Sequence, residues 1–194
     1  MQYISAALEE AQKGLTQLRQ DVETQRLIQS AAQVMVKTFQ AGGRVISCGN
    51  GGSICDAMHF AEELSGRYRD DRPALAAMAI SDASHMSCVA NDYGYEHVFS
   101  RFVEAHGRTG DVFVGFSTSG KSKNVIKAAE AAKKAGMTVV ALTGRVESEI
   151  SKVADIEICT PVGKYADRVQ ELHIKVVHIL IELVERAMFP QNYK

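Results

Sequence analysis

The sequence predicts an α/β protein in which a doubly wound sheet of five parallel strands follows an N-terminal helical arm. From residue 43 onward, short apolar segments alternate with longer segments of helical periodicity. The short segments are continuously apolar, as expected of strands that are covered on both faces. Strands that alternate with helices form right-handed crossovers and therefore parallel sheets.

The chain has the size and composition of one globular domain. It contains 194 residues, of which 46% are hydrophobic and 23% charged; these shares are ordinary for a soluble protein, and a domain usually holds about 100–200 residues. We therefore expect a single domain over residues 1–194. Its arm would cover residues 1–42, and an α/β core with a long C-terminal helix would cover residues 43–194.

Charge and cysteine content argue against several classes of protein. The 22 basic and 23 acidic residues give a net charge of −1, whereas nucleic-acid-binding domains are usually basic. The four cysteines lack the spacing of a zinc site or a disulfide framework. No segment approaches the ~20 apolar residues that span a bilayer, and the N-terminus is acidic where a signal peptide is basic. We expect a cytoplasmic protein that binds neither nucleic acid nor membranes.

The N-terminal arm is expected to consist of two amphipathic helices. Apolar residues recur there at spacings of three and four: Leu8, Ala11, Leu15, Leu18 and Val22, then Leu27, Ile28, Ala31, Val34, Met35 and Phe39. The second pattern ends at Gly42 and Gly43, a common sequence signal for the end of a helix. These helices would pack on the core or on another subunit.

The predicted core alternates five strands with helical segments. The strands are expected at residues 44–48, 74–81, 111–117, 138–144 and 155–161. Helical patterns occupy residues 53–66, 84–105, 122–135, 145–153 and 166–188. Doubly wound sheets bind ligands at the carboxyl ends of their strands. Candidate functional residues are therefore sought where these strands end.

The first predicted strand ends in the glycine-rich segment CGNGGS at residues 48–53. Its glycines allow a sharp turn, Ser53 can cap the following helix, and free amides at a helix N-terminus attract anions. A tight turn without a ligand is the alternative. The segment lacks the spaced third glycine of a dinucleotide site and the Gly-Lys-Ser/Thr of a Walker loop.

The third predicted strand ends in FSTSGKS, residues 116–122, which is rich in hydroxyl groups. Ser117, Thr118, Ser119 and Ser122 can surround a phosphate together with main-chain amides. The alternative is an ordinary helix cap, for which one hydroxyl suffices. Four hydroxyls in this short segment favour the phosphate site.

Polar residues on two predicted helices suggest a catalytic or metal site. His59 and Glu63 are four residues apart and therefore share a helix face, although spacing alone favours a solvated polar pair. On the last helix, Gln170 and His178 are eight residues apart, or about 12 Å along the axis, and can approach one site from two ends. By spacing, His173 is as good a candidate as His178.

Five segments together resemble the phosphoheptose isomerases of the sugar isomerase (SIS) family. They are CGNGGSICDAMHFAEELSGRY, AISD, NDYGYEHVFSR, GDVFVGFSTSGKS and YADRVQELHIKVVHILIELVE, and the resemblance extends over residues 5–189. It implies a flavodoxin-like fold and a homotetramer with helices at its centre. It also implies conversion of sedoheptulose 7-phosphate to glycero-manno-heptose 7-phosphate, the first step toward ADP-heptose and the lipopolysaccharide core.

The same resemblance implies a set of site residues. The catalytic acid and base correspond to Glu63 and His178, and the ligands of a zinc ion to His59, Glu63, Gln170 and His178. The residues that bind the substrate correspond to Asn50, Gly51, Gly52, Ser53, Glu63, Asn91, Asp92, Ser117, Thr118, Ser119, Ser122 and Gln170. Because a glutamine carbonyl is a poor zinc ligand, we expect a weakly held ion, which either assists catalysis or only occupies the empty site.

Two other functions are compatible with this type of sequence. A relative of the family, the DnaA initiator-associating protein, is an adaptor that lacks the acid on the first core helix and the second histidine on the last. Both Glu63 and His178 are present here, which favours an enzyme over an adaptor. A sugar-phosphate sensor is disfavoured because the chain has no separate DNA-binding module and no excess of basic residues.

The last predicted helix carries a wide apolar stripe. Its residues are Ile174, Val177, Leu180, Ile181, Val184 and Met188. We expect that one face of the sheet cannot cover both the arm and this stripe, so that a closed bundle of subunits buries the remainder. His178 would then reach a cleft that is shared with a neighbouring subunit.

Overall fold

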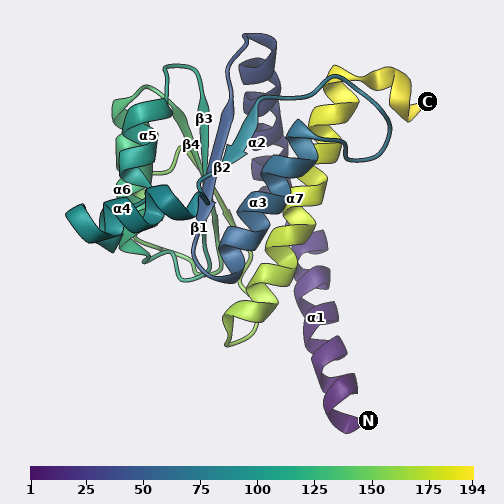
Figure 1. Ribbon diagram of the computed structural model, residues 1–194. Helices are drawn as coiled ribbons and strands as arrows, with labels where there is room; N and C mark the ends of the chain where they lie inside the picture. The colour runs from purple at the N-terminus through teal and green to yellow at the C-terminus, as the bar shows by residue number, and fades with distance from the viewer.

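The computed structural model describes residues 1–194 and has five parallel strands between two layers of helices (Figure 1). The strands are β1 (Val45–Gly49), β2 (Ala77–Ala79), β3 (Val112–Ser117), β4 (Thr138–Thr143) and β5 (Ile156–Cys159). Their order in the sheet is β2-β1-β3-β4-β5, and every pair is parallel. This is the flavodoxin-like strand order, so the predicted fold class is confirmed.

Helices cover both faces of the sheet. Figure 1 shows α2 (Val22–Gln40), α3 (Gly52–Ser65) and α7 (Ala166–Met188) on one side. The other side carries α4 (Ala83–Tyr93), α5 (Ser100–His106) and α6 (Lys123–Lys134). None of the helices combines the length and hydrophobicity that crossing a membrane requires.

Two separate apolar cores explain why the strands are continuously apolar. Along β3, Val112, Val114 and Phe116 belong to the core under α2, α3 and α7, and Phe113 belongs to the core on the opposite face. Successive side chains of a strand point to opposite faces. Because both faces are covered, neither set can be polar, and the periodicity of a half-exposed strand is absent.

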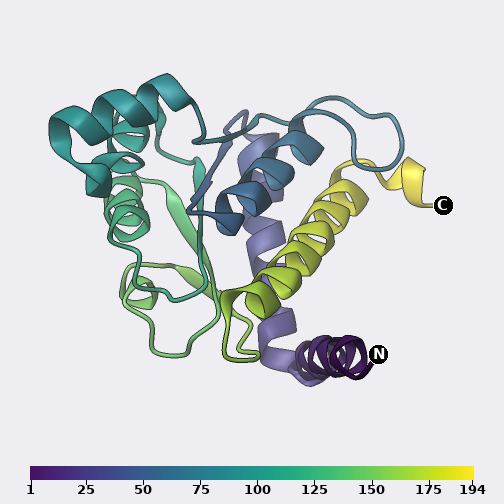
Figure 2. The same ribbon diagram turned by 60° about the horizontal axis from the view of Figure 1, so that its bottom comes forward.

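The two N-terminal helices differ in how they pack. On α2, Ile28, Ala31 and Met35 are buried in the core, whereas α1 (Gln2–Gln20) buries only Gly14 and Leu18. A Cβ at Gly14 would lie 2.5 Å from Cγ2 of Val162, so α1 approaches the loop before α7 closely at this point. The rest of α1 extends away from the sheet (Figures 1 and 2).

Two of the predicted helical segments are wrong in extent. Residues 145–153 form only a 3₁₀ turn, η2 (Ile150–Lys152), because their polar groups bind groups outside the segment. The Ser148 hydroxyl donates to Glu157 of β5, and Ile150 N donates to the carbonyl of Gly120. Residues 84–105 divide into α4, a 3₁₀ turn η1 (Tyr95–His97) and α5, since Gly94 adopts a φ of 90°. A further turn, η3 (Pro190–Tyr193), follows α7.

Most of the apolar stripe of α7 is covered within the single chain, so the stripe does not require a subunit bundle; Ile174 and Met188 are half-buried. Val177, Leu180, Ile181 and Val184 each have an exposed fraction of 0%. The sheet and α2 together cover this face, because α2 packs on the core, one of the two predicted arrangements of the arm. Helix α1 carries several exposed apolar side chains: Tyr3, Ile4, Leu8 and Leu15.

Candidate active site

The loops that follow β1 and β3 lie next to each other at the carboxyl edge of the sheet. Gly49 at the end of β1 is in register with Phe116 near the end of β3. The loop after β1 leads into the N-terminus of α3, and the loop after β3 leads into that of α6. The two glycine- and hydroxyl-rich segments therefore meet where this fold binds ligands, as the sequence predicted.

The glycines of the first loop permit a turn and a close contact with α7. Gly51 has a φ of 54°, a region that side chains other than glycine rarely adopt. A Cβ at Gly52 would lie 2.6 Å from Oε1 of Gln170. Ser53 is buried, and its amide donates to the carbonyl of Asn50. Gly52 thus allows the side chain of Gln170 to reach the start of α3.

Asn50 is held by two residues that the sequence analysis missed. Its amide exchanges two hydrogen bonds with the amide of Asn124, at 2.9 and 2.8 Å. The hydroxyl of Tyr95 donates to Oδ1 of Asn50 at 3.1 Å. Asn124 stands at the start of a helix, where a polar residue is common, so the sequence alone gave no sign of this role.

The second loop has the form of an anion cradle. The Ser117 hydroxyl donates to that of Ser122 at 3.1 Å, and the exposed Ser119 accepts from the amide of Lys121 at 3.2 Å. The carbonyl of Thr118 accepts from Gly144 N. The loop then turns at Gly120 into the N-terminus of α6, and free amides and the helix dipole at such a terminus favour a phosphate.

Gly120 is required by its surroundings as well as by its backbone. Its φ is 64°, and a Cβ there would lie 2.2 Å from Cβ of Ser148. The Ser148 hydroxyl is fixed by Glu157, whose carboxylate also accepts from the hydroxyl of Thr143. Residues 145–153 therefore pack against the second loop, residues 116–122, instead of forming a helix.

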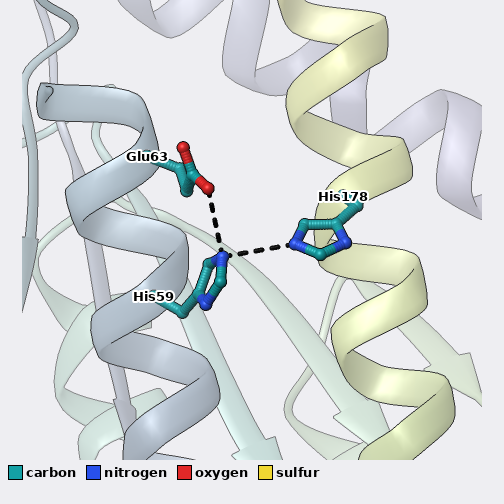
Figure 3. A group of neighbouring side chains, drawn as sticks. All are labelled: His59, Glu63 and His178. Atoms are coloured by element: carbon teal, nitrogen blue, oxygen red, sulfur yellow. Dashed lines mark hydrogen bonds and ion pairs between the residues drawn. The ribbon is translucent and has the colours of Figure 1, made fainter. Parts of the chain in front are cut away.

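Three side chains from two helices converge in a metal-type cluster (Figure 3). Nε2 of His59 lies 3.2 Å from Oε1 of Glu63 and 3.2 Å from Nε2 of His178. The ligand atoms of all three residues lie within 4.8 Å of one another. The cluster joins α3 and α7 and contains three of the four predicted metal ligands.

The donor atoms of this cluster suit zinc. Imidazole nitrogens and a carboxylate oxygen are ordinary zinc ligands, and three of them already converge. Gln170, the fourth predicted ligand, lines an open cleft of about 370 Å³ together with His59. His59, Glu63 and His178 therefore fit a metal ion, and Gln170 lies beside the same cleft.

The protonation of His178 is set by its surroundings. Burial lowers the pKa of its imidazole, and the neighbouring His59 lowers it further. His178 is therefore neutral near pH 7, so it can accept a proton or bind a metal.

The ambiguity between the two histidines of α7 is resolved by burial. His173 has an exposed fraction of 0%, and its Nε2 donates to the carbonyl of Thr143 at 3.1 Å. Burial lowers the pKa of His173 to about 4. His173 is therefore a neutral core residue that faces the sheet, and only His178 reaches the cluster.

Asp56 is a further titratable group that the sequence analysis passed over. It lines the same cleft as His59 and Gln170, and its Oδ2 is buried without a hydrogen-bond partner. Burial raises its pKa to about 6, an effect that His59 partly opposes. Its only sequence signal was its place three residues before His59.

The predicted pair Asn91 and Asp92 stands apart from the cluster in this structure. Both residues are exposed at the end of α4. The amide of Asn91 donates to Asp92 at 2.8 Å, and the thiol of Cys88 contacts the same carboxylate at 3.7 Å. Neither residue forms a hydrogen bond with the two loops or with the His59 cluster. Their role toward the sugar stays a prediction.

The chain is similar to known proteins over nearly its whole length. Residues 8–144 match the family described as the SIS domain. The phosphoheptose isomerase of Haemophilus ducreyi is 56% identical over 188 residues, which is 97% of each chain. That of Enterobacter sp. (strain 638) is 59% identical over 181 residues, covering 93% of this chain and 94% of the relative.

A solved structure shares the fold over nearly its whole length. The phosphoheptose isomerase from Neisseria gonorrhoeae superposes with a TM-score of 0.86 at 38% identity, covering 95% of this chain and 97% of that one. The family match covers more than half of the residues, and the curated relatives match almost from end to end. The chain therefore belongs to the SIS-domain family, within the group of the phosphoheptose isomerases.

Proposed function

We propose that this chain converts D-sedoheptulose 7-phosphate to D-glycero-D-manno-heptose 7-phosphate, by proton transfer through an enediolate. The observation that carries the proposal is the approach of Glu63 and His178, from two different helices, to the same imidazole of His59. Isomerisation of a ketose to an aldose moves a proton between neighbouring carbons, so it needs a base and an acid at one place. The relatives' name supports a seven-carbon sugar phosphate as substrate.

Glu63 and His178 are the proposed proton carriers. His178 is neutral near pH 7 because burial lowers its pKa, so it can take or return a proton at a sugar carbon or oxygen. Glu63 supplies the second carrier from α3. His59, which contacts both, orients them. General acid–base catalysis of this kind contributes about 10²–10⁴-fold to a rate.

The second loop is the proposed phosphate site. Its hydroxyls, on Ser117, Thr118, Ser119 and Ser122, together with the N-terminus of α6, would hold the dianion. The first loop, from Asn50 to Ser53, would contact the sugar from the other side. Because the phosphate does not react, this part of the site binds substrate and transition state alike.

A zinc ion is the proposed cofactor. His59, Glu63 and His178 would bind it, with Gln170 as the fourth ligand. When bound, the ion would polarise the sugar carbonyl as a Lewis acid. A glutamine carbonyl is a weak ligand for zinc, so the ion should exchange readily.

We place the enzyme in the cytoplasm as a homotetramer at the start of ADP-heptose and lipopolysaccharide core synthesis. The exposed apolar side chains of α1, among them Ile4, Leu8 and Leu15, support assembly. Covering such a surface against other copies removes apolar area from water, and homo-oligomers close by point-group symmetry. An adaptor without catalytic activity is disfavoured because both proton carriers are present and adjacent.

The direct test is incubation with sedoheptulose 7-phosphate, followed by NMR. The enzyme should produce the signals of the aldose heptose 7-phosphate until equilibrium is reached. A folded Glu63→Gln variant should leave the substrate unchanged. Lack of conversion by the intact protein, with and without added zinc, would refute the proposed function.

A further inference from the structure

A buried arginine, Arg72, contacts the main chain of the proposed catalytic glutamate, Glu63. Arg72 belongs to the loop that connects α3 to β2, and its side chain has an exposed fraction of 0%. Its Nε donates at 2.8 Å to Oε1 of Glu185, whose side chain is 1% exposed. A charge pair this deep is costly unless its remaining donors and acceptors also find partners, and here they do.

The other donors of Arg72 cap the C-terminus of α3. One terminal nitrogen donates to the carbonyl of Glu63 at 2.6 Å. The other donates to the carbonyls of Leu64 at 2.8 Å and Gly66 at 3.0 Å. The last carbonyls of a helix lack partners within the helix and carry partial negative charge. Since α3 has no basic residue in its last turn, Arg72 supplies this cap from outside.

The acceptor Glu185 ties the cap to α7. Glu185 follows His178 by seven residues, which is about two helical turns, so the two share one face of α7. Its second oxygen, Oε2, accepts from the hydroxyl of Tyr193 at 2.7 Å. Burial and this hydrogen bond raise the pKa of Tyr193, which therefore stays protonated as a donor. The amide of Asn192 also donates to the carbonyl of Asp71 at 3.0 Å.

We propose that Arg72 is a positioning residue for the reaction, acting through the main chain of Glu63. Together with Glu185 and Tyr193 it forms a clamp that fixes the end of α3 against α7. The clamp thereby sets the distance between the Glu63 carboxylate and His178. This inference rests on the proposed function, because Glu63 is taken as a proton carrier.

The clamp should influence the chemical step more than substrate binding. It contacts α3 and α7, whereas the phosphate-type loop stands on β3 and α6. A displacement of about 1 Å between reacting groups can lower a rate about 10²-fold. Loss of the clamp should therefore lower kcat and leave KM nearly unchanged.

The test separates positioning from stability with a double variant. Arg72→Met alone leaves the Glu185 charge buried and unpaired, which endangers folding. The combination Arg72→Met with Glu185→Met removes both charges and fills the space with apolar atoms, a replacement that often preserves stability. It still leaves the carbonyl of Glu63 without its donor. We expect a folded enzyme whose kcat is at least about tenfold lower, with KM within about twofold of the original value.

Two further variants test the clamp if the double variant does not fold and control for general destabilisation. Arg72→Lys keeps the charge but cannot reproduce the planar set of donors, so it should show the same selective loss of kcat. Val103→Ala, in the core on the opposite face of the sheet, is the control for general destabilisation and should keep its kcat. Thermal unfolding by circular dichroism establishes that each variant is folded.

Failure of the clamp can be told apart from failure of the proposed isomerase function. The unaltered enzyme must first convert the sugar phosphate, and Glu63→Gln must abolish that conversion, which tests the function by itself. With that established, a folded double variant or Arg72→Lys enzyme with unchanged kcat would overturn the clamp. A raised KM with unchanged kcat would overturn it too. If the double variant does not fold, the kcat of Arg72→Lys decides.

Discussion

His173 and His178 lie on the same helix, and substitution should separate their roles. We predict that His173→Gln changes the pH dependence of stability and leaves turnover within a few-fold of normal, since His173 only donates to the carbonyl of Thr143 and glutamine can keep that hydrogen bond. His178→Ala should do the reverse. It should abolish turnover at neutral pH, and it should keep the loss of stability at low pH that His173 causes.

The size of the effect follows from the pKa of His173. Burial lowers it from 6.5 to about 4. Between these values the unfolded chain binds a proton that the folded chain does not, so stability is lost as the pH falls. Each pKa unit is worth about 1.4 kcal/mol, so the loss from pH 6.5 to pH 4 amounts to ~3 kcal/mol.

The contribution of Asp56 to stability changes with pH in the opposite direction over part of the same pH range. Its pKa is raised to about 6 from 3.8, so the folded chain keeps a proton that the unfolded chain has released, and this contribution falls as the pH rises through that window. The Asp56 contribution is common to the original protein and to His173→Gln. It therefore cancels when the two proteins are compared.

The assay is urea unfolding followed by circular dichroism at several pH values between 7 and 4.5, at one protein concentration. The stability advantage of the original protein over His173→Gln should shrink by about 1.4 kcal/mol per pH unit below pH 6.5. A constant difference across that range would refute the assignment of His173 as a buried neutral residue. Loss of turnover in folded His173→Gln would refute its exclusion from the site.

Three further predictions concern the phosphate site, the metal and the assembly. Ser119→Ala and Ser122→Ala should raise KM several-fold with little change in kcat, as uniform binding is lost; a fall in kcat alone would contradict a binding role. A chelator should lower activity and added zinc restore it, while calorimetry should detect zinc binding to the original protein and not to His59→Ala. Equal zinc binding by both proteins would contradict the ligand set. Ile4→Asp combined with Leu8→Asp should shift sedimentation to smaller species, whereas unchanged sedimentation would remove α1 from the interface.

The fold was predictable because burial on both faces of the sheet leaves a simple pattern in the sequence. Strands such as β3 are continuously apolar, and the helices between them keep their periodicity. The extra helix predicted at 145–153 failed because Ser148 and Ile150 bind distant groups, Glu157 and Gly120. The stripe on α7 was misjudged because periodicity shows which residues are apolar and not what covers them.

The candidate site was predictable where a topological rule applies. Parallel strands end at one edge, so the loops after β1 and β3 were expected to meet there. Spacing could not choose between His173 and His178, because that choice depends on how α7 is rotated against α3. The roles of Asn124 and Arg72 could not be predicted, because the residues that they bind are distant in the sequence. Asn124 binds Asn50, and Arg72 binds Glu185.

The central claim is that Glu63 and His178 transfer a proton between neighbouring carbons of a sugar phosphate. Its most direct test is isomerisation of sedoheptulose 7-phosphate in deuterium oxide, monitored by NMR, with the original protein and with Glu63→Gln. The account predicts that the original enzyme forms the aldose with deuterium at carbon 2, and that folded Glu63→Gln forms none. Conversion by folded Glu63→Gln at the original rate would contradict the account.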